Sequence, residues 1–219
     1  MKVAIDGPAG AGKSSIAKAV SKQLGFVYID TGAMYRAVAV YAIENGIEIK
    51  EENFTQQVLD NIKIELAYED GTQKIFLCGK DVSERIREAD VSIGASNVAV
   101  IPSVRLKLVE LQRSLSEKTS VIMDGRDIGT YVLPDAEVKI FLTATSDVRA
   151  QRRLLEMREK GMEADFETVK RDIEYRDKND SEREFAPLRQ AEDAVLVDSS
   201  DMTIEQVIHR IIGIIEEGK

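Results

Sequence analysis

One octapeptide near the start of the chain constrains the fold more than any other feature. Residues 7–14 read Gly-Pro-Ala-Gly-Ala-Gly-Lys-Ser and fit the pattern G-x-x-x-x-G-K-[ST]. The apolar run Val3 to Asp6 precedes them and predicts a strand, and Ser14 to Leu24 follows with helical spacing. A glycine-rich loop between a strand and a helix lets backbone N–H groups converge on phosphate oxygens. The octapeptide therefore predicts a nucleotide-binding P-loop.

The residue types in and near this loop suit a nucleoside triphosphate with its magnesium ion. Lys13 would reach the β- and γ-phosphates, and the Ser14 hydroxyl would ligate Mg²⁺. Asp124 ends the apolar run Val121 to Met123, where a carboxylate could hold Mg²⁺ directly or through water. We therefore expect a nucleoside triphosphate, bound with Mg²⁺ by Gly7, Pro8, Ala9, Gly10, Ala11, Gly12, Lys13, Ser14 and Ser15.

Short apolar runs alternate with helical patterns along much of the chain. The later runs are Phe26–Asp30, Val121–Asp124, Lys139–Thr143 and Val195–Asp198. This alternation predicts an α/β P-loop NTPase fold, in which a parallel sheet carries helices on both faces. Gly25 and Gly161 are placed to end helices, and Thr203 with Gln206 forms a capping box that opens the last helix.

An antiparallel unit interrupts this pattern. Ile62 to Tyr68 alternates apolar with polar residues, Asp70-Gly71 supplies a turn, and Lys74 to Cys78 returns, which predicts a hairpin with Cys78 as a small hydrophobe in a strand. We expect one domain with an inserted antiparallel subdomain. The expected ranges are 1–36, 99–148 and 190–219 for the core, 37–98 for the insert, and 149–189 for an arginine-rich helical segment.

The composition limits the kinds of partner and of catalysis. The net charge of −9 argues against nucleic acid or an anionic membrane as the partner. One cysteine and one histidine, His209, exclude an internal disulfide and make metal clusters and histidine-centred catalysis poor expectations; we expect His209 to be solvated. Without a signal-peptide-like or membrane-spanning run, the chain is expected to be cytoplasmic. We separately expect a monomer.

A P-loop alone does not distinguish a kinase from a switch or a motor. A GTPase would need a guanine-reading N/T-K-x-D segment, and the nearest match, Asp177 to Asp180, begins with Asp inside a charged helical stretch. We interpret that segment as a chance match. The charge-dense stretch from Arg149 to Arg189 is, on composition alone, a solvated helix face.

Several motifs together resemble those of the bacterial cytidylate kinase family, a branch of the nucleoside monophosphate kinases, over essentially the whole chain. Their order and spacing carry the resemblance. They are Gly7–Ser14, Asp30–Arg36, Ser96 with Arg105, Asp124–Gly129, Pro134-Asp135 before Lys139–Leu142, and Arg176 through Arg183 to Leu188.

The resemblance implies roles for individual residues. It places Arg36, Arg126 and Arg183 on the acceptor's monophosphate, where a guanidinium fork suits bidentate contact. It makes Ser96, Arg105 and Asp127 base readers, since a carboxylate matches the N4 amine of cytosine. It makes Arg176 and Asp180 a sugar-contacting pair, although their spacing also fits an ordinary helix ion pair. Thr31 keeps the hydroxyl of the serine usual at its position in the family.

The resemblance also implies one kinase domain, in which the insert is a monophosphate-binding subdomain and residues 149–189 form a short helical lid with its arginine-rich segment. The expected reaction is direct in-line phosphoryl transfer from ATP to CMP or dCMP, in pyrimidine nucleotide metabolism. The acceptor is expected to bind between the core and the inserted hairpin. Lys13 and Arg126 would stabilise the transferred charge, with lid arginines chosen from Arg149, Arg152 and Arg153; we favour Arg149 and Arg153. The alternatives are a P-loop kinase for another nucleotide or small metabolite, and a nucleotide-binding switch without turnover.

Overall fold

The computed structural model describes residues 1–69, 72–159 and 161–218. The chain forms two compact units, each described by itself below. Unit 1 comprises Met1–Val27 and Ser120–Lys219, and unit 2 comprises Tyr28–Thr119. Among the described residues, we find no helix with both the length and the apolar character needed to cross a membrane.

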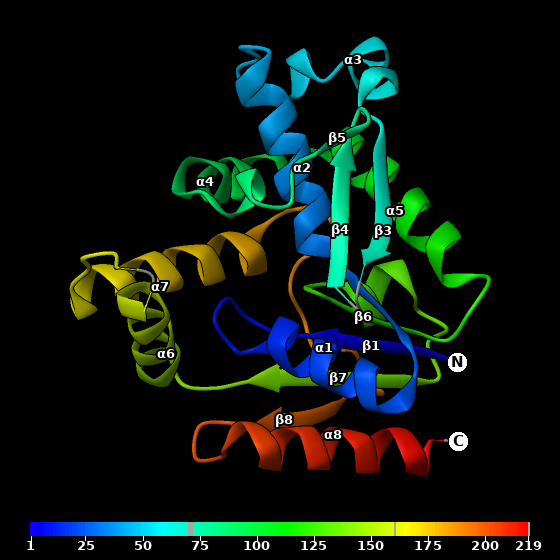
Figure 1. Cartoon of the computed structure of the whole chain (residues 1–219), viewed down its shortest axis with the longest axis vertical. Helices are drawn as coiled ribbons and strands as arrows, with labels where there is room; N and C mark the ends of the chain where they lie inside the picture. Colours follow the sequence, from blue (N-terminus) through cyan, green and yellow to red (C-terminus); the bar gives the residue numbers. More distant parts are fainter. Residues whose placement is uncertain (70–71, 160, 219) are drawn as a thin grey trace. The chain divides into compact units, whose positions relative to one another are not determined.

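A parallel sheet organises unit 1 (Figure 1). Its strand order is β2-β6-β1-β7-β8, and the chain leaves unit 1 at β2. The strands are β1 (Lys2–Asp6), β2 (Val27–Asp30), β6 (Val121–Gly125), β7 (Val138–Thr143) and β8 (Val195–Asp198). The register pairs Asp6 with both Gly125 and Phe141, and Thr143 with Asp198, so that these strands end at one edge of the sheet.

The sequence of the inner strands explains their burial. Val3, Ala4 and Ile5 of β1 are fully buried, as are Val121, Ile122 and Met123 of β6. A continuous apolar run suits a parallel strand that is covered on both faces. The strands expected from these runs are confirmed, each within two residues of its expected bounds.

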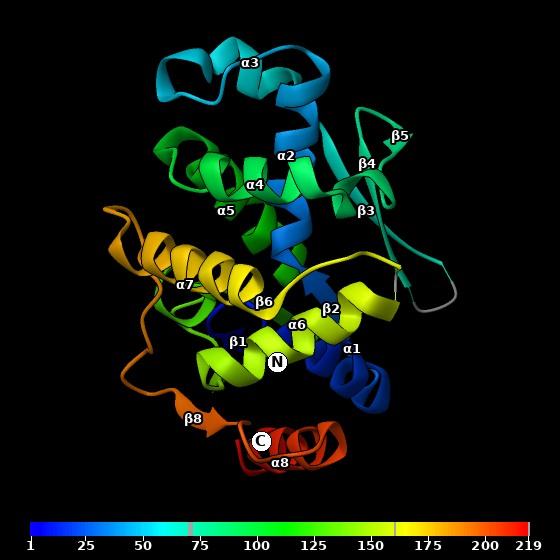
Figure 2. The same ribbon diagram turned by 90° about the vertical axis from the view of Figure 1, so that its left-hand side faces the viewer.

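The helices of unit 1 are α1 (Lys13–Leu24), α6 (Ser146–Glu159), α7 (Phe166–Glu182), α8 (Ile204–Glu217) and the short η3 (Ile128–Val132). Helix α1 packs on β6 and on α8, and α8 packs on β7, so these two helices cover the same face of the sheet. Helices α6 and α7 pack on each other (Figure 2). The expected Gly25 stop and the Thr203–Gln206 capping box are both present.

Unit 2 combines a small antiparallel sheet with helices. Strands β3 (Ile64–Glu69), β4 (Thr72–Leu77) and β5 (Lys80–Asp81) pair in that order, which confirms the expected hairpin, while its Asp70-Gly71 turn lies outside the described residues. The helices are α2 (Thr31–Glu44), η1 (Glu51–Asn53), α3 (Gln56–Asn61), η2 (Arg85–Arg87), α4 (Ala89–Val98) and α5 (Pro102–Ser116). Because α2 contacts α4, α5 and β4, the unit extends beyond the range 37–98 expected for the insert.

The expectation for Cys78 is wrong. Cys78 follows β4 instead of lying within it, and its side chain is exposed. Cys78 and Gly79 both have positive φ, 51° and 81°, and they join Leu77 to its partner Lys80. Two residues with positive φ form the tight hairpin turn that matches strand twist, and this turn ends the strand one residue early.

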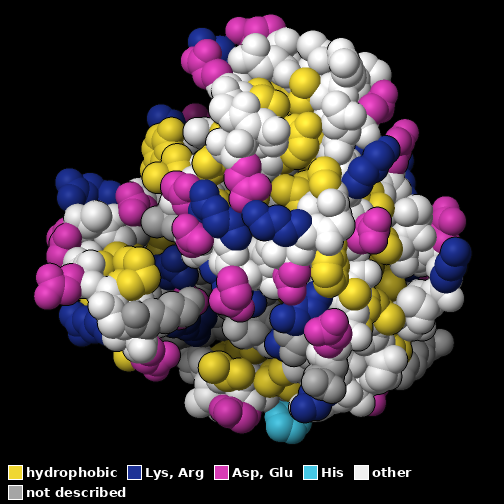
Figure 3. All heavy atoms as spheres, turned by 45° about the horizontal axis from the view of Figure 1, so that its top comes forward, with side chains coloured by type: hydrophobic (Ala, Val, Ile, Leu, Met, Phe, Trp, Pro, Cys, Tyr) yellow, Lys and Arg dark blue, Asp and Glu magenta, His cyan; other side chains and the backbone are white. Residues whose placement is uncertain are grey.

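The surface carries charges of both signs. On the face shown in Figure 3, Lys and Arg side chains are interspersed with Asp and Glu. His209 is exposed, as expected, and its Nδ1 lies 2.8 Å from the carbonyl oxygen of Glu205. Charges of one sign do not gather on this face, so it does not mark a binding site for a charged ligand.

Candidate active site

The P-loop needs glycine at Gly7 because of close packing and at Gly12 because of its positive φ. Gly7 has φ 149°, and a Cβ there would lie 1.9 Å from the carbonyl oxygen of Leu142 in β7. Gly12 has φ 87° and directly precedes α1, which begins at Lys13. The free N–H groups of the first turn of α1 thus open onto the loop, and such a helix end attracts anions.

Lys13 is buried beside the loop, with 5% of its surface exposed. Its ammonium donates a hydrogen bond of 2.8 Å to the carbonyl oxygen of Pro8. Burial, and then the nearby positive charge of Arg126, lower the pKa of Lys13 from 10.5 to about 7. The lysine therefore stands in a place that favours an anionic partner.

Ser14 and Asp124 meet at the first turn of α1. The Ser14 hydroxyl donates to Oδ2 of Asp124 at 2.8 Å, and Asp124 is 4% exposed at the end of β6. Across residues 1–69, 72–159 and 161–218, no three His, Cys, Asp or Glu side chains gather into a metal site. Two hard oxygen donors without a protein cage fit Mg²⁺, which keeps waters and takes further ligands from phosphates.

Asp6 anchors a second loop of the site, a role that sequence reasoning missed. Its Oδ1 accepts from the N–H of Ile128 at 2.8 Å, and its Oδ2 accepts from the N–H of Gly129 at 2.7 Å. The carboxylate thereby caps η3 and fixes the preceding pair, Arg126 and Asp127. Burial raises the pKa of Asp6 from 3.8 to about 6, against the lowering by these two N–H groups. The only sequence signal was an acidic residue that ends a buried strand.

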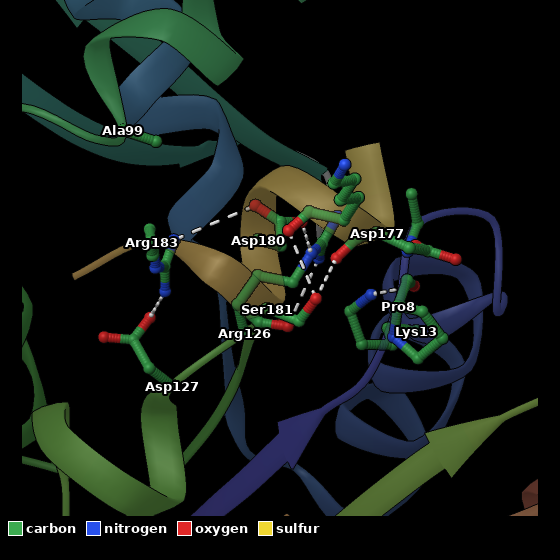
Figure 4. A network of polar contacts seen from close by, with 12 residues as sticks. Pro8, Lys13, Ala99, Arg126, Asp127, Asp177, Asp180, Ser181 and Arg183 are labelled. Atoms are coloured by element: carbon green, nitrogen blue, oxygen red, sulfur yellow. Dashed lines mark hydrogen bonds and ion pairs between the residues drawn. The ribbon is translucent and has the colours of Figure 1, made fainter. Parts of the chain in front are cut away.

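Two guanidinium groups expected at the acceptor phosphate are held by carboxylates (Figure 4). Nε of Arg126 donates to Oδ2 of Asp180 at 2.7 Å. Arg183 bonds Oδ1 of Asp127 at 3.0 Å and lies 3.8 Å from Oδ1 of Asp180. Asp180 therefore bridges the two arginines.

Arg176 lies among other arginines. Burial, and then the charges of Arg153 and Arg126, lower the pKa of Arg176, so both of these guanidinium groups lie close to that of Arg176. Arg176 stands one helical turn before Asp180 on α7. The two residues thus lie on the same helix face, as their i,i+4 spacing predicted.

The three arginines at the start of the expected lid differ in what they contact. Arg149 is 6% exposed and donates to the carbonyl oxygens of Ala144 and Ala9, each at 2.8 Å. Arg152 bonds both Ser199 Oγ and the Ser199 carbonyl oxygen. Arg153 is half-buried and pairs with Glu156 at 2.9 Å. Sequence alone could not separate these roles, since all three follow one strand end.

Asp177 is a further residue that sequence reasoning missed, because it begins the segment interpreted as a chance match. Its Oδ1 accepts from the N–H of Ala9 in the P-loop at 3.1 Å. Its Oδ2 pairs with Arg149 at 2.6 Å. The available signal was its position three residues before Asp180, which puts both carboxylates on one side of α7.

In unit 2, Asp30 organises the start of α2. Its Oδ1 caps the helix by accepting from the N–H of Ala33 at 2.9 Å, and its Oδ2 pairs with Arg36 at 2.8 Å. Thr31 is buried beside it. Arg36 thus resembles Arg126 and Arg183 in being held by a carboxylate.

The two expected base readers of unit 2 lie on its helices. Arg105 on α5 is 1% exposed, donates to the carbonyl oxygen of Ala99 at 3.1 Å and stacks 5.5 Å from the ring centre of Tyr35. Ser96 is half-buried on α4. A buried arginine held over an aromatic ring keeps a fixed direction, which suits recognition of a planar ligand.

Comparison with known proteins shows extensive similarity. A family model described as cytidylate kinase matches residues 3–217. The cytidylate kinase of Caldicellulosiruptor saccharolyticus is 52% identical over 212 residues, which cover 97% of this chain and 94% of that protein. The cytidylate kinase of Lactobacillus johnsonii is 49% identical over 217 residues, or 99% and 94% of the two chains.

Solved structures of low identity share the fold. An uncharacterised protein from Eubacterium ventriosum superposes with a TM-score of 0.53 at 15% identity, covering 99% of this chain and 98% of that one. A shikimate kinase from Bacteroides thetaiotaomicron gives 0.50 at 15% identity, with the same coverage. These similarities support the α/β architecture alone.

Replacing Asp6 by Asn should change how stability depends on pH. A carboxyl whose pKa is raised in the folded state contributes stability below pH 3.8 that is lost as the pH rises through about 6. The free energy of unfolding of the wild type, minus that of Asp6→Asn, should therefore fall by about 2 kcal/mol between pH 4 and 6. Urea unfolding across this range measures it, and parallel pH curves for the two proteins would contradict the assignment.

Proposed function

Because this chain belongs to the cytidylate kinase family, we propose that it transfers the terminal phosphoryl group of ATP to CMP and dCMP, releasing ADP with CDP or dCDP. The observation that carries the proposal is the closeness of the groups assigned to donor and acceptor. The Arg126 guanidinium is near enough to Lys13 to lower the pKa of its ammonium. Two cations so placed suit a donor phosphate and an acceptor phosphate side by side.

On the donor side, the P-loop backbone from Gly7 to Ser15 would surround the phosphates, and Lys13 would exchange its bond to Pro8 for phosphate oxygens. Ser14 and Asp124 would hold Mg²⁺, which supplies charge neutralisation of the polyphosphate when bound. The P-loop motif and the oxygen donors of Ser14 and Asp124 support this assignment.

On the acceptor side, we assign Arg126 and Arg183 to the monophosphate. Their carboxylate partners would act as placeholders, because a doubly charged phosphate offers a stronger bidentate partner than a shared carboxylate. The resemblance extends the same role to Arg36 of unit 2, which is also carboxylate-bound.

The chemistry then needs positioning more than proton transfer. An acceptor phosphate oxygen, already anionic near neutral pH, would form a bond to the γ-phosphorus while the bond from that phosphorus to the bridging β-oxygen breaks in line. No general base is required, and ADP leaves with the electron pair. Arg176, which lies near both Arg126 and Arg153, would add positive charge around the migrating group together with Arg153.

Recognition of the nucleoside is assigned by resemblance. Asp127 would accept from the N4 amine of cytosine, and Ser96 and Arg105 of unit 2 would meet its acceptor atoms. Arg176 and Asp180 would contact the sugar, with Thr31 completing the set. We further propose that the enzyme works in the cytoplasm, where its nucleotide substrates are present, and that it is a monomer.

An ADP-release assay across acceptors tests the proposed function. With ATP and Mg²⁺, CMP and dCMP should give rapid turnover, and UMP, AMP and GMP much less. Turnover with another acceptor only, or with none, would favour a different P-loop kinase or a switch.

Lys13→Ala should lower turnover by roughly a thousandfold or more while circular dichroism stays native, because Lys13 stabilises transferred charge.

Asp127→Asn tests base reading with little disturbance of Arg183. Asparagine keeps an oxygen that can accept from Arg183, but its amide can also donate to O4 of UMP, which the carboxylate would repel. The kcat/KM for CMP should fall about a hundredfold and that for UMP should not, so the preference between them narrows.

Steady-state kinetics on both acceptors decides this point. If Asp127 serves only to orient Arg183, both acceptors lose activity alike. An unchanged CMP-to-UMP ratio in the variant would therefore remove Asp127 from the base-reading role.

A further inference from the structure

One residue of the P-loop, Ala9, is held at both its backbone N–H and its carbonyl oxygen by an ion pair whose arginine is buried. The N–H of Ala9 donates to Oδ1 of Asp177 at 3.1 Å, and its carbonyl oxygen accepts from Nη1 of Arg149 at 2.8 Å. The two side chains also pair with each other, with Nη1 of Arg149 2.6 Å from Oδ2 of Asp177. Ala9, Arg149 and Asp177 thus close a ring of three contacts, which we call the Ala9 clamp.

The helices that carry the clamp are packed against the loop. A Cβ on the next residue, Gly10, would lie 3.4 Å from Cβ of Arg149 and 3.6 Å from Cδ1 of Ile173. An apolar cluster unites α6 with α7 beneath this contact; it contains Ala150, Leu154, Val169 and Ile173. The position of Asp177 is therefore fixed by packing, and Figure 4 shows its side chain directed from α7 towards the loop of Pro8 and Lys13.

The burial of Arg149 strengthens its contacts in the clamp, while the Asp177 side chain is 23% exposed. Arg149 has 7% of its side chain exposed, and its Nε is fixed by the Ala144 carbonyl oxygen at the end of the strand region. A guanidinium removed from water in this way must keep its acceptors, and removal of one partner leaves a charge uncompensated. An exposed pair would contribute far less.

We propose that Asp177 is a positioning residue for the donor phosphates. Together with Arg149, it fixes the backbone N–H and carbonyl groups of Ala9 and hence the curvature of the P-loop. Arg149 then acts through the loop backbone and not on the migrating phosphoryl group. The inference rests on the proposed function only in taking the P-loop as the donor site. It adds a role for a residue that the phosphate-binding motif does not contain.

Nucleotide binding without acceptor tests the clamp separately from the acceptor's identity. Asp177→Ala removes both contacts of the carboxylate, whereas Asp177→Asn keeps an acceptor for the Ala9 N–H and loses the charge. We expect the Kd for MgATP, measured by calorimetry, to rise about tenfold in Asp177→Ala and about threefold in Asp177→Asn. The KM for CMP should stay within about twofold of the wild type in both.

Two further variants separate positioning from general damage. Glu174→Gln, which neutralises an exposed carboxylate on the same helix, should leave both constants unchanged. The double variant Arg149→Ala with Asp177→Ala should bind MgATP no more weakly than the weaker-binding single variant, because each substitution breaks the same ring of contacts. Urea unfolding curves identify any variant that does not fold. If Asp177→Ala does not fold, the Kd of Asp177→Asn for MgATP decides in its place.

Three results would overturn the proposal. The first is a folded Asp177→Ala with an unchanged Kd for MgATP. The second is equal weakening of MgATP and CMP. The third is an additive loss of kcat on combining the Arg149 and Asp177 variants, because this would place Arg149 directly on the transferred group.

Discussion

The need to hold several positive charges together, before any phosphate arrives, governs unit 1. A phosphoryl-transfer site requires cations around the migrating group, yet a buried cation without a partner is costly. The chain meets both demands with carboxylates that form ion pairs with the guanidinium groups. The pairs are Arg126 with Asp180, Arg183 with Asp127, and Arg149 with Asp177. Lys13, whose bond is to a carbonyl oxygen, instead has a lowered pKa.

These pairs serve different purposes. Asp180 and Asp127 hold arginines that we assign to a substrate phosphate, so their bonds must exchange during turnover. Asp177 and Arg149 bond to a backbone peptide that persists through the reaction, so their contacts need not change. Helix α7 carries both kinds of carboxylate three residues apart, at Asp177 and Asp180, and thereby links donor and acceptor groups through one rigid element.

The sequence predicted what local patterns determine. The P-loop, the strand segments, and the caps at Gly25 and Thr203 each depend on residues close in the chain. All are present, with the strands within two residues of their expected bounds. Cys78 was misplaced because a turn with positive φ at a non-glycine residue leaves no pattern. Asp6 and Asp177 were missed for another reason: each bonds backbone N–H groups distant in sequence, at Ile128, Gly129 or Ala9, and no spacing rule predicts such partners.

If the carboxylates on Arg126 and Arg183 are placeholders for the acceptor phosphate, bound CMP must displace them from these guanidinium groups. Nuclear magnetic resonance of the guanidinium groups during a CMP titration detects this exchange, with Arg→Lys variants for assignment. We expect the Arg126 and Arg183 resonances to shift as CMP saturates the enzyme, while those of Arg149 stay in place. Unchanged Arg126 and Arg183 resonances at saturation would contradict this exchange.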